Sequence, residues 1–167
     1  MLKDFLLLFL CFLLQTSLGR EIAVLGAGPN FLVIALVFTS SKKGPIDSMI
    51  RYGLPLGLMQ DFASSGYFGL GLTVQAANGF FAGLLLKQTY GDNHLSKAGI
   101  AALVTLIDGF VSLALIKFYY GGGNIFASFF SYTVPSALYT GLLMFILLGA
   151  GSVLKGFFSR TRKTYGF

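Results

Sequence analysis

Six long apolar runs take up most of this chain of 167 residues. Hydrophobic residues make up 55% of the sequence and charged residues only 11%, which leaves too little polar surface to cover a water-soluble globule. A helix needs about 20 mainly apolar residues to cross a bilayer, so the length allows about six spans joined by short loops. The sequence therefore predicts an all-α integral membrane protein, a six-transmembrane helix bundle forming a single domain over residues 1–167.

The ends of the apolar runs predict the limits of the spans. We expect spans at approximately residues 5–18, 22–40, 46–63, 69–86, 97–119 and 126–154, followed by a basic cytoplasmic tail at 155–167. The third run is short and contains Gly53, Pro55 and Gly57. We expect its helix to begin at Pro45, since proline suits the first helical turn, and to kink at Pro55. The sixth run is longer than a bilayer requires, which implies tilt or an extension into the cytoplasm.

The first apolar run allows a second interpretation. Lys3 gives it a basic start, and Ser17-Leu18-Gly19 places small residues where a signal peptidase would cut. We favour a retained helix over a cleaved signal peptide. The single cysteine, Cys11, lies in this run, so the chain cannot form an internal disulfide.

Basic residues are concentrated in alternate loops. Ten of the 12 lysines and arginines fall on one side of the predicted membrane, and only Arg20 and Lys117 fall on the other. The positive-inside rule therefore places both termini, and the loops around Lys43 and His94, in the cytoplasm. Lipid headgroups next to these loops account for the net charge of +6. Nucleic acid is an unsuitable partner, because the sequence has no basic helix face and no stacking platform.

Two acidic residues, Asp61 and Asp108, lie inside the apolar runs. A carboxylate at the centre of a bilayer costs about 2.5–3.5 kcal/mol on insertion scales, so it usually faces a partner helix, a cavity or an ion path. Asp61 follows Gln60 and precedes an irregular turn that includes Gly66. Irregular backbone at membrane depth must be covered by protein or water, so we expect this corner to be enclosed.

A polar seam is predicted between the fourth and fifth spans. Gln75 and Asn78 are three residues apart and share one helix face, and Asp108 lies near the middle of the next span. The seam is either structural, with hydrogen bonds worth about 0.6 kcal/mol each on average, or the lining of a functional site. For Asp108 the alternatives are a neutral acid that donates to a neighbouring helix, and a group that handles protons or a ligand.

Two pairs of glycines are spaced for close helix contact. Gly53 and Gly57 form one such pair, and Gly79 and Gly83 form the other. Small residues at this spacing let membrane helices approach until their backbones touch. We favour packing within one chain over a dimer interface.

Motifs of enzymes are weak or lacking in this sequence. The segment from Gly26 to Phe31 resembles the start of a dinucleotide-binding fingerprint, but Phe31 replaces the third glycine and an apolar span follows. We interpret it as a turn into the second span, with Pro29 at the first helical position. His94 has no companion metal ligands, and no serine or cysteine has a base at a suitable spacing. The sequence predicts a protein without enzymatic activity, metal or cofactor.

Several segments together resemble the MreD family of bacterial rod shape-determining proteins. They are Leu13-Leu-Gln15-Thr-Ser-Leu18, Gly28-Pro29-Asn30-Phe-Leu-Val-Ile, Gly57-Leu-Met-Gln-Asp61-Phe-Ala-Ser-Ser-Gly66, Gly69-Leu-Gly-Leu and Gly79-Phe-Phe-Ala-Gly83. The length, the six runs and Pro135 in the last one also resemble that family. The family often has an acidic residue where this chain has Asn30.

The resemblance implies a non-enzymatic scaffold of the cell-elongation machinery in the bacterial inner membrane. Its implied partners are the bitopic protein MreC, the filament MreB, the glycosyltransferase RodA with its penicillin-binding transpeptidase, and membrane lipids. The family is also similar to substrate-binding subunits of energy-coupling-factor transporters, which suggests a small-molecule-binding subunit as the alternative. Those subunits usually carry an Ala-x-x-x-Ala pair on the first helix, and residues 5–18 contain no alanine, so we favour the scaffold. The candidate site residues are Pro29, Asn30, Gly57, Gln60, Asp61, Gly66, Gln75, Asn78, Gly79, Gly83 and Asp108.

Overall fold

The computed structural model describes residues 2–19, 21–23, 27–41, 43–64, 68–89, 93–121 and 125–164, with side chains up to residue 152. Regular structure in these ranges is helical, which confirms the all-α prediction. In chain order the elements are α1 (Leu2–Leu18), α2 (Phe31–Ser40), α3 (Pro45–Ser48), η1 (Met49–Gly53), α4 (Leu54–Ala63), α5 (Leu70–Gln88), α6 (His94–Tyr120), α7 (Ile125–Ser128), η2 (Phe129–Thr133) and α8 (Val134–Thr164).

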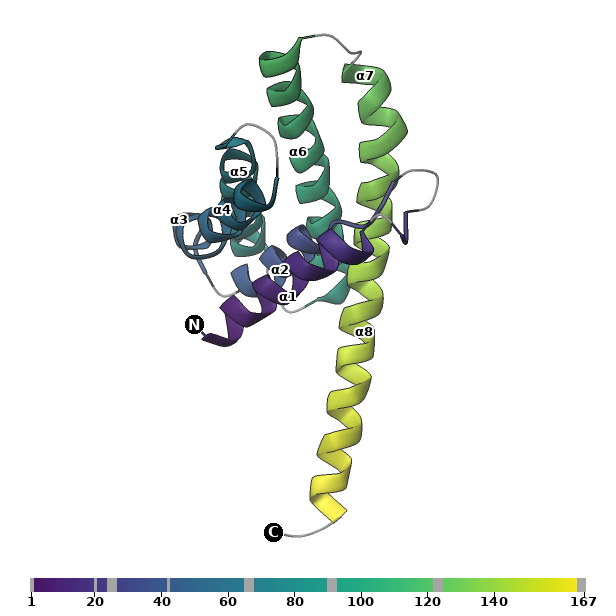
Figure 1. Ribbon diagram of the computed structural model, residues 1–167. Helices are drawn as coiled ribbons and strands as arrows, with labels where there is room; N and C mark the ends of the chain where they lie inside the picture. Colours follow the sequence, from purple (N-terminus) through teal and green to yellow (C-terminus); the bar gives the residue numbers. More distant parts are fainter. Residues whose placement is uncertain are drawn as a thin grey trace.

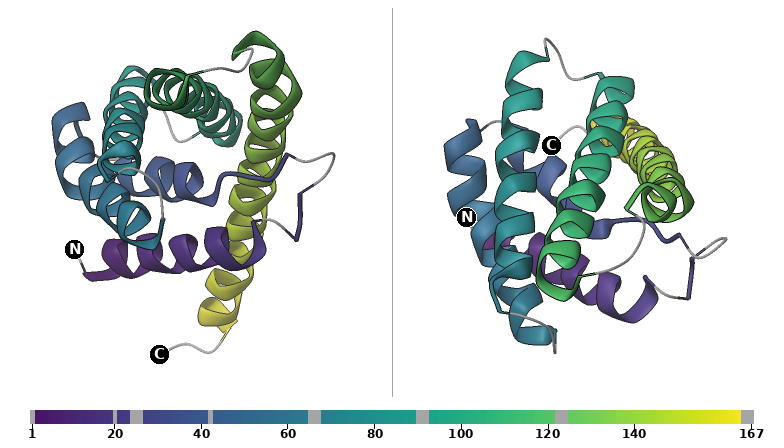
Figure 2. Two further views of the ribbon diagram at one scale, coloured as in Figure 1. Left: turned by 45° about the horizontal axis from the view of Figure 1, so that its top comes forward. Right: turned by 90° about the horizontal axis from the view of Figure 1, so that it is seen from above.

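The helices pack in two groups (Figures 1 and 2). In one group α4 lies beside α5, and in the other α6 lies beside α8. Helix α1 crosses the direction of α8, and the C-terminal part of α8 extends beyond the other helices (Figure 1). Helix α2 contacts members of both groups, so it joins them at the centre of the molecule.

The core is organised around α2. Every residue from Leu32 to Val37 in this short helix is buried. One side of α2 packs with apolar residues of α5, α6 and α8, and the other side packs with residues of α1, η1 and α4. A helix that is apolar on all sides needs neighbours on all sides, which explains its central position.

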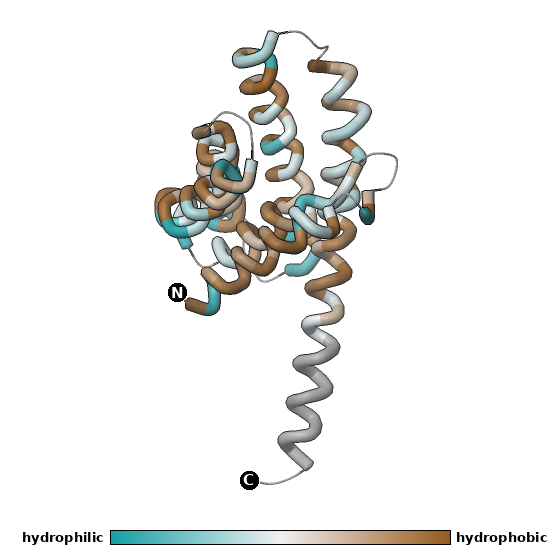
Figure 3. Tube along the Cα trace, in the orientation of Figure 1, coloured by the Kyte–Doolittle hydropathy of each residue, from teal (hydrophilic) through white to brown (hydrophobic). Residues whose placement is uncertain are grey.

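The outer surface is strongly apolar. Phe118, Phe126 and Leu138 are 83%, 77% and 70% exposed. Figure 3 shows that hydrophobic residues are frequent along the described helices. Two helical stretches, His94–Tyr120 and Ile125–Ser152, are long and apolar enough to cross a membrane, with mean hydropathies of 2.2 and 1.7. Such a surface suits lipid better than water.

The second apolar run differs from its prediction. Helix α2 begins only at Phe31, and not at residue 22, and Asn30 caps it by accepting a hydrogen bond from Val33 N at 3.1 Å. Placing Pro29 at the first helical position was therefore wrong. An asparagine side chain satisfies an otherwise unpaired N–H of the first turn, so the helix begins after Asn30.

A π-helical turn precedes the proline in both α4 and α8. Helix α3 begins with Pro45, as predicted, and the chain stays helical through Pro55 because the π-helical turn η1 precedes it. The π-helical turn η2 precedes Pro135 in the same way. A proline ring clashes with the carbonyl four residues earlier in a regular α-helix, and a wider turn relieves that clash.

Candidate functional site

The carboxylate of Asp61 holds the start of α5. It accepts hydrogen bonds from three backbone N–H groups, those of Gly69 at 2.9 Å, Gly71 at 2.7 Å and Leu72 at 3.0 Å. The N-cap residue of α5 is Gly69, which has no side chain to satisfy the N–H groups of the first turn. Asp61 belongs to α4, so it caps a neighbouring helix. Its negative charge also suits the positive end of the helix dipole.

The Asp61 side chain is enclosed, but Ser64 at the irregular end of α4 is exposed, which differs from the fully enclosed corner that the sequence predicted. Asp61 is only 5% exposed, and Gln60 lies beside it with its side chain bonded to Gln75 across the α4–α5 interface. Ser64 ends α4 and donates to the Asp61 carbonyl at 3.3 Å. Gly66, which was also predicted to belong to this corner, lies outside the described residues.

The predicted glycine pairs lie at one interface within the chain. A Cβ atom on Gly57 would come within 2.5 Å of Leu72 Cα, and one on Gly53 within 2.5 Å of Gln75 O. On α5, a Cβ atom on Gly79 or Gly83 would lie 3.0 Å from Ser48 O or 2.8 Å from Pro45 Cα. Such distances leave no room for side chains. These glycines therefore allow α5 to pack against the helical stretch from α3 to α4.

The predicted polar seam is present and extends further than expected. Gln75 donates to Gln60 at 2.9 Å, and Asn78 donates to Gln75 at 3.3 Å and to the Asp108 carboxylate at 2.5 Å. Asn30 donates to the other oxygen of Asp108 at 3.1 Å. The chain of side chains thus connects α4, α5, α6 and the start of α2. In both side-chain contacts Asp108 is the acceptor and an amide is the donor.

Two residues that accept hydrogen bonds from the backbone at the start of α2 were not singled out from the sequence as site residues. Gln15 on α1 accepts from Phe31 N at 2.8 Å, and Thr140 on α8 accepts from Asn30 N at 2.9 Å. Thr140 in turn donates to Ser136 O at 2.7 Å. Pro29 is fully buried next to this junction. The signal for Thr140 was its spacing of four residues from Ser136, which places two hydroxyl groups on one helix face.

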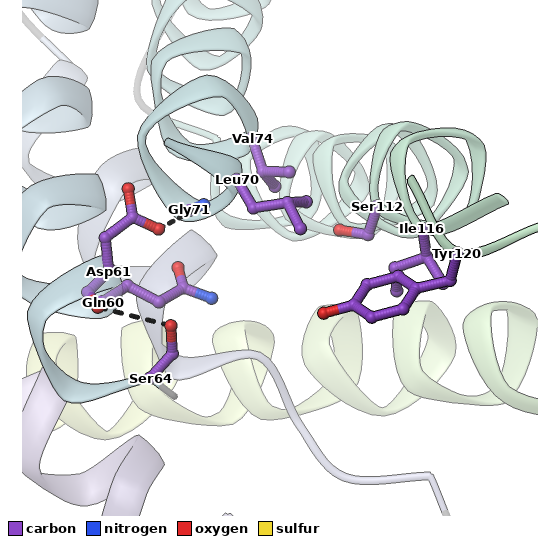
Figure 4. Close-up of a pocket in the computed structure, with 9 residues that line it drawn as sticks. All are labelled: Gln60, Asp61, Ser64, Leu70, Gly71, Val74, Ser112, Ile116 and Tyr120. Carbon is purple, nitrogen blue, oxygen red and sulfur yellow. Dashed lines mark hydrogen bonds between the residues drawn. The ribbon is translucent and has the colours of Figure 1, made fainter. Parts of the chain in front are cut away.

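A cavity of about 520 Å³ lies beside the Asp61 corner (Figure 4). Gln60, Asp61 and Ser64 line one side of it, and α6 lines the opposite side (Figure 4). The α6 residues follow a spacing of four and therefore share a face: they are Ser112, Ile116 and Tyr120. Leu70, Gly71 and Val74 of α5 complete the lining. The cavity separates the C-terminal half of α6 from the α4–α5 pair.

Helix α1 is joined to η1 by a polar contact. Tyr52, which is buried, donates its hydroxyl hydrogen to Asp4 at 3.3 Å. A cavity of about 330 Å³ lies next to this contact, and Leu2, Phe5, Leu8, Arg51 and Tyr52 line it. Arg51 is also paired with Asp47 at 3.4 Å, an exposed pair of small energetic value.

A protein-family model described as rod shape-determining protein MreD matches residues 2–149. The chain belongs to the MreD family. The match includes every candidate residue from Pro29 to Asp108 and all the hydrogen bonds of the polar seam. No curated protein and no solved structure matches the chain. The resemblance to energy-coupling-factor subunits stays a prediction.

Membership in the MreD family assigns the chain to rod shape determination. It is a family of shape-determining membrane proteins, and the apolar helices of this chain suit that setting. Among the described residues, no three His, Cys, Asp or Glu side chains gather where they could hold a metal ion.

Proposed function

We propose that this MreD-family chain is a non-enzymatic scaffold of the cell-elongation complex that binds an MreC-like single-span protein. The family match over residues 2–149 carries the proposal. The structure supports it, because both carboxylates inside the predicted spans take part in contacts between helices of the same chain. Asp61 caps α5, and Asp108 joins α5, α6 and the start of α2. Such contacts hold the helices in fixed positions relative to one another, as a scaffold requires.

The exposed apolar surface of the framework is available for lipid and for a partner helix. It includes Phe110, Phe118, Phe130 and Leu138, each more than half exposed, on α6, η2 and α8. Membrane helices associate through close packing and hydrogen bonds, and not through burial from water. A rigid apolar face is therefore suited to a single-span partner. Through that partner the chain would act with MreB, RodA and the penicillin-binding transpeptidase in lateral peptidoglycan synthesis.

The proposed setting is the bacterial inner membrane, crossed six times with both termini in the cytoplasm. The asymmetric distribution of lysine and arginine supports this orientation. The C-terminal end of α6 and helix α7 lie at the far end of the molecule from the C-terminal end of α8 (Figure 1), as expected if two spans run in opposite directions.

Affinity purification in mild detergent tests the proposal. The full chain, tagged and expressed in its own host, should retain an MreC-like protein in stoichiometric amount and proteins of wall synthesis with it. Retention of paired ATPases and their coupling subunit, or saturable nanomolar binding of a vitamin by the isolated chain, would contradict the scaffold function.

A further inference from the structure

A cavity of about 210 Å³, separate from the one beside Asp61, is lined in part by Asp108. It lies between α6, η2, the start of α8 and the segment that leads into α2. Its lining residues are Ala27, Gly28, Thr105, Asp108, Gly109, Tyr132, Thr133 and Ser136. Tyr132 is 58% exposed, so the cavity reaches the outer surface of the molecule there. Neither the polar seam nor the proposed scaffold function accounts for this cavity.

The lining of this cavity is rich in hydrogen-bond acceptors. Thr105 donates its hydroxyl hydrogen to Ala101 O at 2.8 Å, and Ser136 donates its own to Gly28 O at 2.7 Å. Each hydroxyl oxygen keeps lone pairs after its hydrogen has been used. Asp108 adds a carboxylate. The cavity therefore offers several oxygen acceptors, beside the hydroxyl groups of Tyr132 and Thr133.

The positive charge that should balance Asp108 is missing from the described part of the chain. Two neutral amides, from Asn30 and Asn78, are the donors to its carboxylate, and no described lysine, arginine or histidine lines the cavity. Buried carboxylates are normally paired, so the site lacks a donor that carries positive charge.

We propose that this cavity binds the ammonium or guanidinium group of a basic side chain from a partner's membrane helix. Both groups carry only donors, which complements a lining of acceptors. The cavity is bordered by an apolar surface, since Phe110, Phe130 and Leu138 on the same helices are each more than half exposed. A group that approaches across this surface comes from within the membrane. The inference rests on the proposed function, and it identifies the contact that the single-span partner makes.

Removal of the charge at Asp108 tests the inference. The full chain carrying Asp108→Asn should retain at least about ten-fold less MreC-like partner in mild detergent than the wild type, at equal abundance. Asp47→Asn is the matched control, because it removes an exposed carboxylate far from the cavity lining, and it should retain the partner fully. Unchanged retention by Asp108→Asn would overturn the inference and leave the scaffold function intact. A wild-type chain that retains no partner would overturn both.

Cross-linking tests the same contact with Asp108 left in place. Tyr132→Cys at the rim of the cavity, with Cys11→Ser to remove the native thiol, should form a disulfide with a cysteine placed at a membrane-embedded lysine or arginine of the partner. Cysteine at Phe118, which lies on α6 outside the cavity lining, should not form it. Equal cross-linking at both positions would overturn the inference. The inference would also be overturned if the cavity binds a free cation instead of the partner. The evidence for this would be thermal stabilisation by sodium that Asp108→Asn abolishes, together with unchanged retention of the partner.

Discussion

The Oδ1 atom of Asp61 lies 2.7 Å from the backbone nitrogen of Gly71, ten positions further along the chain. A Cβ atom on Gly71 would lie 2.7 Å from the same oxygen, so the glycine allows the carboxylate to reach the backbone. This relationship fixes the end of α4 to the start of α5. It also suggests where substitutions will have the largest effects.

We expect Asp61→Asn to be milder than Asp61→Leu. The amide keeps one oxygen that can accept from Gly69, Gly71 or Leu72, whereas leucine leaves all three N–H groups without this acceptor. Each unsatisfied buried donor costs about 1–3 kcal/mol. The measurement is rescue of cell shape in a depletion strain, with membrane abundance checked by immunoblot. Equal failure of both variants would show that the charge itself is required, and normal shape with Asp61→Leu at normal abundance would refute the capping role.

We expect Gly57→Ala to lower stability by about 1–3 kcal/mol, because the new methyl group would lie 2.5 Å from Leu72 Cα and the backbones would have to separate. The measurement is unfolding of the purified protein in detergent. Gly99→Ala is the matched control, since a methyl group there would point into open space and alanine favours a helix by about 1 kcal/mol. Equal stability of the two variants would show that the α4–α5 backbones are not in contact.

We expect Asn78→Leu to destabilise the protein by about 1–3 kcal/mol. The substitution removes one of the two amides that donate to Asp108 and also the donor to Gln75. Gln88→Leu on the same helix replaces an exposed amide and should change stability by no more than about 0.5 kcal/mol. Thermal unfolding in detergent measures both. A stable Asn78→Leu variant would mean that the seam adds no structural stability.

We expect a cysteine at His94 to be protected from a membrane-impermeant thiol reagent in intact cells. The distribution of basic residues predicts that the loop before α6 lies in the cytoplasm. Protection should be lost when the cells are permeabilised, with Cys11→Ser as background. A cysteine at Tyr119, near the opposite end of α6, should react in intact cells. Labelling of the His94 position from outside would overturn the topology.

Local sequence spacing was sufficient for part of the site. Gln75, Asn78 and Asp108 were predicted to share a seam because a helix of fixed period places residues three apart on one face. The glycine pairs predicted close packing within the chain. These features depend on the spacing of residues within one helix, whereas the contact between Asn78 and Asp108 joins residues 30 positions apart.

Other features depend on which helices become neighbours. Asp108 was expected to need a partner, but nothing near it in the sequence indicated Asn30, which is 78 positions away. The same holds for Thr140, 110 positions from Asn30. The late start of α2 also follows from this junction, where Asn30 caps the helix and Gln15 and Thr140 bond to the adjacent backbone.

The sequence by itself determined the helical membrane class, the family, and which polar residues inside the apolar runs, such as Asp61 and Asp108, needed polar partners. These follow from composition and helical period, which act locally. The tertiary structure decided which partner each of those residues has, that Asp61 caps a helix other than its own, and that Asp108 lines a cavity. Hydrogen bonds between distant segments form only where helix packing brings donor and acceptor within about 3 Å, and no local pattern encodes that distance.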